Sequence, residues 1–256
     1  MTNMVANYTS ASQTARVLTE AWVGENMPCP ACGGLLDQTP NNTRACDFRC
    51  ATCRDPFELK SKKSALRNLV PDGAYDSMIG AIRDNRAPNL FLLQYKLPFS
   101  VINLSVLPKR FLVEPMVIRR KPLAATARRA GWVGCNLDLS MVSLHALIPC
   151  IVDGALLDQA NVRAQWARTA PLEGLESAAR GWAAVALGCI FRIGQRDFTL
   201  DDVYRFEQIA ARAYPNNRNV RAKLRQQLQV LRDMGIVVFN GRGHYSLRPI
   251  SDRKDQ

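Results

Sequence analysis

The order of apolar and polar positions predicts that helices and strands follow one another along the first two thirds of the chain. In residues 9–23 apolar side chains recur at spacings of three and four, which is the period of a helix with one buried face. The residues expected on that face are Val17, Leu18, Ala21 and Trp22. A second helix is predicted over 74–84, because an Asp-Gly turn precedes it and Ala87-Pro88 follows it.

Three runs rich in aliphatic and aromatic residues predict buried strands, at 89–95, 100–107 and 147–152. A basic stretch at 119–132 lies between the last two of them, contains a proline and ends on an aromatic residue. Helices and strands in this mixture are typical of an α/β domain with a mixed sheet.

The pattern changes after residue 171, where helices are followed by a single hairpin. Helices are predicted at 178–192, from Thr199 onward and at 220–234, and the Thr199 hydroxyl can accept a first-turn amide as an N-cap. The segment IVVFNGRGHYSLRP then predicts a hairpin that turns at Asn240-Gly241. Three helices and a hairpin indicate a winged helix-turn-helix. We therefore expect two domains, 1–175 and 176–256.

The composition favours a polyanionic partner. The chain has 256 residues, 47% of them hydrophobic, and a formal net charge of +12 with a pI near 9.7. On charge alone, a basic protein without a nucleic-acid partner stays open. The sequence shows no signal-peptide pattern and no apolar run of membrane-spanning length. We expect a cytoplasmic protein, a monomer, with no membrane partner.

Four of the eight cysteines form two Cys-x-x-Cys pairs, Cys29 with Cys32 and Cys50 with Cys53, separated by 17 residues. Two such pairs at this spacing match a tetrahedral structural Zn²⁺ site with four thiolate ligands. The alternative is a chance pairing of buried cysteines. Cys46 lies outside both pairs, and the other three cysteines are expected to be small core residues. They are Cys135, Cys150 and Cys189.

The second cysteine pair is interleaved with charged residues that a zinc site does not need. If residues 58–60 form a strand, Glu58 and Lys60 share one of its faces, and Asp47 at the end of a partner strand could bring its carboxylate to that of Glu58. Two carboxylates beside a lysine can hold a hard divalent cation and orient a water. By itself the pattern D-x10-E-x-K is a weak signal, because strands often expose an acid and a lysine to solvent.

Polar and basic residues cluster at the start and along one side of the third C-terminal helix, and another arginine lies in the hairpin. The first turns of a recognition helix are where side chains reach base edges in the major groove. The residues expected to contact DNA are Asn217, Arg218, Asn219, Arg221, Arg225 and Arg242. A solvated basic helix on a protein-interaction module is the alternative.

Several long segments resemble the DpnI-like family of methyl-directed restriction endonucleases, in order from about Ser12 to Tyr245. They are DFRCATC, FELKSKK, RKPLAATARRAGWVGCNLDLS, FTLDDVYRFE and RQQLQVLRDMGI. The resemblance implies a D…E-x-K (restriction-endonuclease-like) nuclease core with a structural zinc site and a C-terminal winged-helix domain. It also implies cleavage of double-stranded DNA at G-A-T-C when the adenine is N6-methylated. The hairpin departs from the family pattern.

The same resemblance assigns roles to single residues. The catalytic residues would be Asp47, Glu58 and Lys60, and Mg²⁺ would be held by Asp47, Glu58 and the carbonyl of Leu59. Glu20 could reach that metal through water. Trp132 corresponds to the aromatic residue associated with methyladenine recognition. Independently of the resemblance, Arg128 and Arg129 in the basic approach to Trp132 can clamp phosphates beside the site. A core role for Trp132 is the alternative.

A protein of another class shares most of these features. A zinc-containing winged-helix regulator would also be basic and would bind DNA without cutting it. Under that interpretation Asp47, Glu58 and Lys60 would have no reason to converge.

Overall fold

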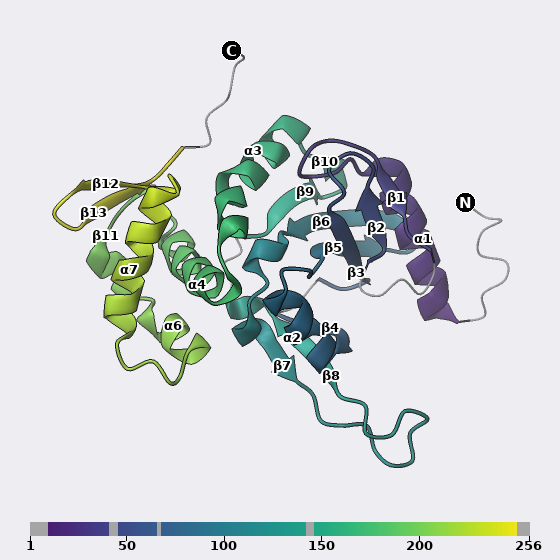
Figure 1. Cartoon of the computed structure of the whole chain (residues 1–256). Coiled ribbons are helices and arrows are strands. Elements are labelled where there is room, and N and C mark those ends of the chain that lie inside the picture. The colour runs from purple at the N-terminus through teal and green to yellow at the C-terminus, as the bar shows by residue number, and fades with distance from the viewer. Residues whose placement is uncertain (1–9, 41–45, 66–67, 142–145, 250–256) are drawn as a thin grey trace. The chain divides into compact units, whose positions relative to one another are not determined.

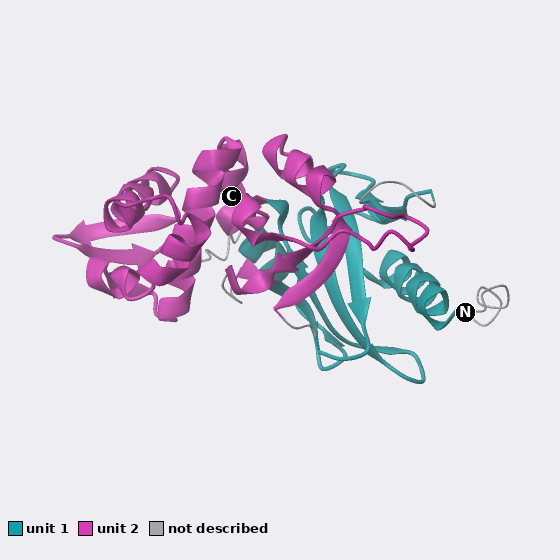
Figure 2. Cartoon of the chain, turned by 90° about the horizontal axis from the view of Figure 1, so that it is seen from below, with its two compact units in different colours: residues 1–66, 88–109, 148–166 teal, residues 67–87, 110–147, 167–256 magenta. Residues whose placement is uncertain are grey.

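The computed structural model of the chain describes residues 10–40, 46–65, 68–141 and 146–249. The chain forms two compact units, each assembled from three separate segments (Figure 2). The first unit comprises 1–66, 88–109 and 148–166, and the second comprises 67–87, 110–147 and 167–256. Within the described ranges, every helix is too short or too polar to cross a membrane.

The first unit is built on a seven-stranded sheet in the order β1-β2-β3-β5-β6-β9-β10 (Figure 1). Neighbouring strands are antiparallel except β3 and β5, which are parallel, so the predicted mixed sheet is confirmed. The strands are β1 (Leu36–Gln38), β2 (Phe48–Cys50), β3 (Pro56–Lys62), β5 (Asn89–Lys96), β6 (Ser100–Leu107), β9 (Ile148–Val152) and β10 (Ala155–Leu156). The three strands predicted from aliphatic and aromatic runs correspond to β5, β6 and β9.

The core of this unit lies on one face of the sheet, beneath α1 (Ala11–Asn26) and α3 (Gln159–Thr169). Phe57 of β3 stacks on Phe91 of β5 with ring centroids 4.9 Å apart, and Trp166 of α3 packs against Phe57. Both phenylalanines are fully buried, and each contributes about 2 kcal/mol by leaving water. Because side chains alternate along β3, residues 58 and 60 lie on the opposite face of the sheet from this core.

The predicted face of the first helix is confirmed only in part, since Trp22 packs against the core but the most buried residues are others. Thr19, Glu20 and Val23 are the buried residues of α1, whereas the four residues expected there are only partly buried. The reason is polar bonding that an apolar pattern does not register: the Thr19 hydroxyl lies 3.2 Å from that of Ser61 on β3, and Glu20 is bonded by Gln38. Thr9, where the predicted helix begins, lies outside the described residues.

The second unit contains a three-stranded antiparallel sheet in the order β4-β8-β7. Its strands are β4 (Leu69–Ala74), β8 (Gly134–Asp138) and β7 (Val117–Arg119), and α2 (Tyr75–Arg83) packs on the sheet. α2 confirms the helix predicted over 74–84. The basic stretch joins β7 to β8 as a long loop that extends away from the ends of these strands (Figure 1).

The same unit carries the predicted C-terminal helices, beginning with α4 (Ser177–Ile193). Arg180 near the start of α4 is almost fully buried and donates to the carbonyl of Ile82 and to Asn85, at the end of α2. Burial lowers the pKa of Arg180. These bonds tie α4 to α2, so the C-terminal helices are anchored on the element that covers the small sheet.

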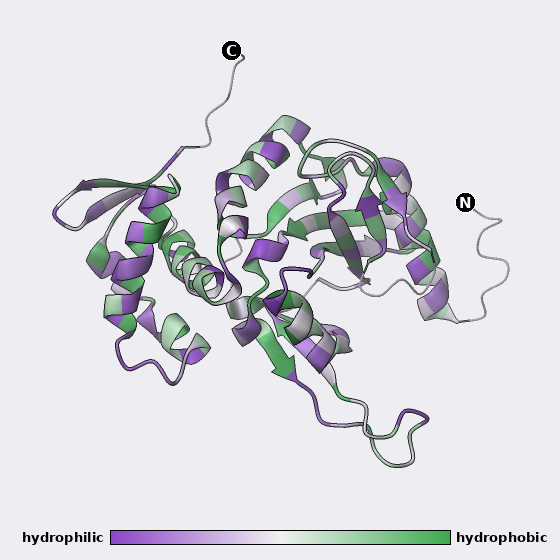
Figure 3. Ribbon diagram, viewed as in Figure 1, coloured by the Kyte–Doolittle hydropathy of each residue, from purple (hydrophilic) through white to green (hydrophobic). Residues whose placement is uncertain are grey.

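The helix predicted from Thr199 is two helices, α5 (Leu200–Tyr204) and α6 (Glu207–Ala213), so the single-helix prediction is wrong. Thr199 does form the predicted N-cap: it accepts from the amide of Asp202, whose carboxylate accepts from the Thr199 amide in return. Hydrophobic periodicity runs unbroken through 205–206, and it cannot show where backbone bonding is interrupted. The third helix is α7 (Val220–Asp233), and hydrophilic and hydrophobic bands alternate along it (Figure 3).

The predicted hairpin is present, with its turn two residues later than expected. β12 (Val237–Gly241) and β13 (His244–Leu247) pair, and β11 (Asp197–Thr199) joins the other edge of β13. Gly241 pairs with His244, so Arg242-Gly243 forms the turn and Asn240 lies in the strand at a bulge. Gly243 has φ +77°, which favours glycine at this turn, and Asn240 bonds to Ser246 across the strands.

Candidate functional site

The first part of the candidate site is the place where β2 begins to pair with β3. Asp47 directly precedes β2, and its amide donates to the carbonyl of Phe57 at 2.8 Å. Its carboxylate Oδ2 accepts from the amide of Leu59 at 2.7 Å. The two strands pair only at residues 48–49 and 56–57. The carboxylate therefore takes the position that a further backbone carbonyl of β2 would have held.

Glu58 and Lys60 lie together on the next positions of β3. Lys60 Nζ is 2.6 Å from Glu58 Oε1, and both side chains are 15% exposed. This is the same-face arrangement that strand periodicity predicts. The Asp47 carboxylate reaches the backbone between these two residues, so all three predicted catalytic residues lie within one short segment of the hairpin.

A second acidic group reaches the same region from α1. Arg16 bonds to Glu20 one turn later in the helix, and its Nη2 lies 3.6 Å from Asp47 Oδ1. Gln38 of β1 donates to the other oxygen of Glu20 at 2.9 Å. Arg16 thus links Glu20 to Asp47.

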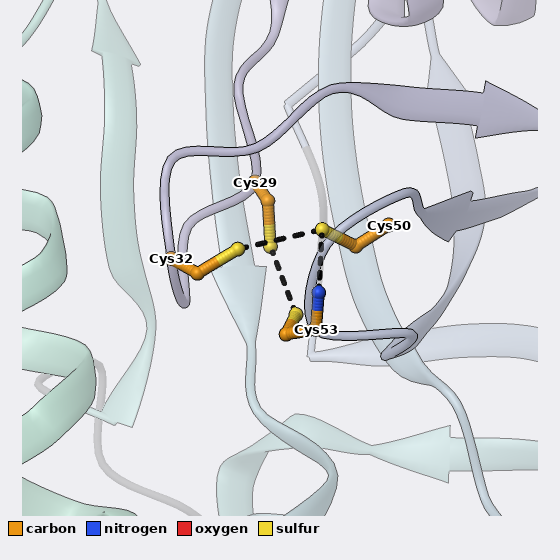
Figure 4. A group of neighbouring side chains, drawn as sticks. All are labelled: Cys29, Cys32, Cys50 and Cys53. Atoms are coloured by element: carbon orange, nitrogen blue, oxygen red, sulfur yellow. Dashed lines mark hydrogen bonds between the residues drawn. The ribbon is translucent and has the colours of Figure 1, made fainter.

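The four cysteines predicted to hold zinc converge from two loops (Figure 4). Cys29 and Cys32 precede β1, Cys50 ends β2, and Cys53 lies in the turn to β3. The sulfur atoms of Cys32 and Cys50 are 3.4 Å apart, those of Cys29 and Cys53 are 3.7 Å apart, and all four lie within 4.8 Å of one another. Among the described residues, these cysteines are the one group of three or more His, Cys, Asp or Glu side chains that could hold a metal ion together.

The sulfur geometry fits zinc. A Zn–S bond of about 2.3 Å in a tetrahedron separates sulfur atoms by about 3.8 Å. Amides of Gly34 and Cys53 point at Cys32 and Cys50 sulfur, each at 3.4 Å, as donors that favour a thiolate. Burial raises the pKa of Cys29, and it raises that of Cys53 to about 12. For Cys50 burial acts in the same direction, but hydrogen bonds from the amides of Cys53 and Thr52 and from the thiols of Cys32 and Cys53 together outweigh it and lower the pKa to about 7.

The remaining cysteines have other surroundings. Cys46 is buried and donates its thiol to the carbonyl of Phe48, so its sulfur is directed to the backbone. Cys135, Cys150 and Cys189 are fully buried, as the sequence predicted. Burial raises the pKa of Cys150 and of Cys189 to about 12.

Trp132 lies at the base of the long loop between β7 and β8. Its indole is half-buried, and the guanidinium of Arg129 lies over the ring at 4.7 Å. A Cβ on Gly134 would lie only 2.7 Å from the ring, so the indole packs directly on that glycine. Gly131 has φ +76°, which lets the loop close through a bond from its amide to the carbonyl of Leu123. Arg128 is exposed.

The predicted DNA-contacting residues of the C-terminal part divide into two groups. Asn217 and Asn219 shape the turn before α7, because Asn217 Oδ1 accepts from the amide of Asn219, which occupies the N-cap position. Arginines at four positions have exposed side chains, and one of them, Arg221, is bound by Glu207 and Tyr204. The four are Arg218, Arg221, Arg225 and Arg242.

Sequence reasoning missed the residues that hold other site residues in place. Arg16 and Gln38 bond to Glu20, and Glu207 bonds to Arg221. The spacing of four between Arg16 and Glu20 is a helical-pair signal that could have been used. The other two contacts join separate elements, so only the fold brings them together.

Two family models match the chain. The DpnI model, described as the Dam-replacing family, matches residues 1–174, and the DpnI_C model, described as the Dam-replacing HTH domain, matches residues 178–247. The first covers the β2–β3 hairpin with its acidic residues and the four cysteines. The second covers the C-terminal helices from α4 onward and the β12–β13 hairpin. The chain belongs to the DpnI, or Dam-replacing, family of methyl-directed restriction enzymes.

Proposed function

We propose that this chain is a type II methyl-directed endonuclease that hydrolyses double-stranded DNA at G-A-T-C sites carrying N6-methyladenine, with Mg²⁺ as cofactor. The observation that carries the proposal is a pair of contacts on β3. The Asp47 carboxylate accepts from the amide of Leu59, and Lys60 bonds to Glu58 on either side of that residue. Family membership supplies the reaction class. The proposal includes a D…E-x-K nuclease core in residues 1–175 and a winged-helix DNA-binding domain in residues 176–256.

The donor set suits a hard cation. Asp47 and Glu58 offer carboxylate oxygens, and the N–H and C=O of one strand residue point to the same side. Because the Leu59 amide donates to Asp47, the Leu59 carbonyl is directed to that side as well. Mg²⁺ prefers such oxygen ligands and would supply positive charge that polarises the scissile phosphate.

The basic residues complete the site. Lys60 Nζ, now held by Glu58, is the donor placed to position the attacking water or to balance negative charge on the phosphate. Arg16 bonds to Glu20 and lies 3.6 Å from Asp47, and we propose that Glu20 contacts the metal through water. The four-cysteine cluster would hold Zn²⁺ with no ligand position left over, so its role is to fix the hairpin that carries Asp47.

The partner is adenine-methylated duplex DNA, which the helix-turn-helix domain would bind through α7. A nuclease of host or invading DNA works where that DNA is, so we place the protein in the cytoplasm, where reduced thiols can bind zinc. The exposed arginines near α7 and in the 120–133 loop supply the positive charge for phosphate contacts. Trp132 is the proposed contact to the methyladenine.

The test is cleavage of one plasmid in methylated and unmethylated form, with Mg²⁺. Methylated plasmid should be cut and unmethylated plasmid should stay intact. Asp47→Asn keeps an oxygen for the Leu59 amide but removes the charge, so it should reduce cleavage by roughly 100-fold or more while binding persists. Lys60→Ala should behave in the same way.

Asp37→Asn is the matched control, because Asp37 is an exposed acid on the adjacent strand β1. It should cut at the wild-type rate. Cleavage retained in Asp47→Asn would refute the active-site assignment. Equal cutting of both plasmids would refute methyl dependence. Binding of methylated DNA with no cutting by the wild type would favour the regulator over the nuclease.

A further inference from the structure

Arg221 is held differently from its neighbours on α7. It is the second residue of the helix, in the first turn, where a recognition helix reaches base edges. Its Nε and Nη2 bond to the two carboxylate oxygens of Glu207, at 2.5 and 3.1 Å, and its guanidinium lies over the ring of Tyr204 at 5.1 Å. Three elements, α5, α6 and α7, therefore fix one side chain.

The contact uses only one edge of the guanidinium. Nε and Nη2 form its side edge, and the end edge, made by Nη1 and the outer hydrogen of Nη2, is directed away from Glu207. The side chain of Arg221 is 64% exposed, and Glu207 does not occupy the end edge. An end edge presented in this way matches the O6 and N7 acceptors that guanine displays in the major groove.

Stabilisation of the fold is a poor explanation for this pair. Exposed ion pairs contribute little to folding, because both partners are well solvated when separated. The pair does restrict Arg221 before DNA arrives, which lowers the entropy lost on binding. The hydrogen bonds from Arg221 lower the pKa of Glu207, so the carboxylate is ionised at neutral pH.

Other basic residues of α7 lack this arrangement. Lys223 bonds to Gln226 and lies near the Trp182 ring, and Arg232 at the far end pairs with the adjacent Asp233. Arg225 is exposed one turn after Arg221. A flexible exposed arginine suits a phosphate, whereas a guanidinium fixed on its side edge and on one ring face suits a base.

We propose that Arg221 reads a guanine of the G-A-T-C site through its end edge, and that Glu207 and Tyr204 are positioning residues for it. This inference rests on the proposed function, since it takes G-A-T-C as the bound sequence. Glu207 holds the side edge of the guanidinium, which is adjacent to the end edge that would face the base, so in this role it contacts Arg221 and not the base.

The test is a binding cycle between protein and DNA variants. Full-length protein without added Mg²⁺ is titrated with methylated G-A-T-C duplex, and with the same duplex carrying 7-deazaguanine, which lacks N7, in both strands. Wild type should bind the 7-deaza duplex roughly tenfold more weakly. Arg221→Ala should bind the normal duplex more weakly and show almost no further loss on the 7-deaza duplex.

Glu207→Gln gives a signature that charge alone cannot produce. Removing an acid beside DNA should strengthen binding to a duplex without G-A-T-C, yet the preference for guanine over 7-deazaguanine should fall several-fold because Arg221 is no longer held. Asp233→Asn is the control, since it breaks an exposed arginine pair at the other end of α7. It should leave the preference unchanged.

Melting temperatures of all variants show whether the domain stays folded. The proposal is overturned if wild type and Arg221→Ala lose the same factor of affinity on the 7-deazaguanine duplex. It is also overturned if Glu207→Gln keeps the wild-type preference for guanine over 7-deazaguanine. These outcomes are distinct from failure of the proposed function, in which wild type would show no preference for methylated G-A-T-C over an unrelated duplex.

Discussion

Trp132 and Gly134 make the methyl-recognition hypothesis testable at single residues. The indole packs on Gly134 so closely that a methyl group there would displace it. Burying one methyl of adenine is worth on the order of 1 kcal/mol, or about a fivefold preference. Strong dependence on methylation therefore needs more than one reader, or a reader whose contact is coupled to cleavage.

We expect Gly134→Ala to move the indole and lower the methylated-to-unmethylated cleavage ratio by about fivefold or more, with Trp132 still present. Trp132→Ala should lower it at least as far. Gly73→Ala is the matched control, because Gly73 lies on the neighbouring strand β4 and a Cβ there meets nothing within 4 Å. The measurement is cleavage rate on both plasmids, with melting curves. A wild-type ratio in Gly134→Ala and Trp132→Ala would make Trp132 a packing residue only.

At the scale of elements, the second cysteine pair and the catalytic residues belong to the same hairpin, β2 to β3, and the first pair reaches it from the loop before β1. Cys50 ends β2 three residues after Asp47, and Cys53 precedes β3 by three residues. A cluster that clamps this turn sets the register in which Asp47 meets the Leu59 amide. Zinc bound there would act on catalysis through position, without touching the substrate.

We expect Cys53→Ser to lose zinc and to lower the melting temperature by more than about 5 °C. Its cleavage rate should fall in parallel with the fraction of folded protein. Metal analysis of purified protein and thermal unfolding check this. Cys46→Ser is the control, because its thiol lies outside the cluster and a hydroxyl can make the same bond to Phe48. Wild-type protein without stoichiometric zinc, or normal stability in Cys53→Ser, would contradict a structural zinc site.

Local patterns predicted the elements whose cause is local. The strands β5 and β6, the helix α2 and the Thr199 cap follow from runs, turns and capping residues within a few positions. Long-range pairing was beyond the same reasoning. Strands β4 and β8 pair residues 60 to 69 positions apart. The buried face of α1 includes Thr19 and Glu20 because these residues meet Ser61 and Gln38.

The candidate site divides in the same way. Cysteine spacing and strand alternation predicted which side chains would meet in the hairpin, because both are short-range geometry. Arg180 shows what sequence spacing cannot give. It is a charged residue in an apolar helix, and its bonds to Ile82 and Asn85 exist only because α2 and α4 pack together.

At the scale of the whole molecule, the net charge of +12 favours DNA binding, and the number of phosphates that Lys and Arg neutralise sets how that binding responds to salt. Each phosphate that a Lys or Arg neutralises contributes about 0.9 to the slope of log affinity against log salt, whatever the sequence. Arg218 and Arg225 belong to the helix-turn-helix part, and Arg128 belongs to the long loop. Salt slopes therefore report which of these regions engages one duplex.

We expect Arg218→Ala, Arg225→Ala and Arg128→Ala each to reduce the slope by about 0.9 and to weaken methylated and unmethylated duplexes equally, because phosphate contacts do not read sequence. If the helix-turn-helix and the loop bind the same DNA molecule, the triple variant should reduce the slope by the sum of the three single reductions. Titrations at several salt concentrations with one short methylated duplex measure this. Should Arg128→Ala leave the slope unchanged while the other two lower it, the loop does not contact phosphate, and its arginines would act through Trp132 alone.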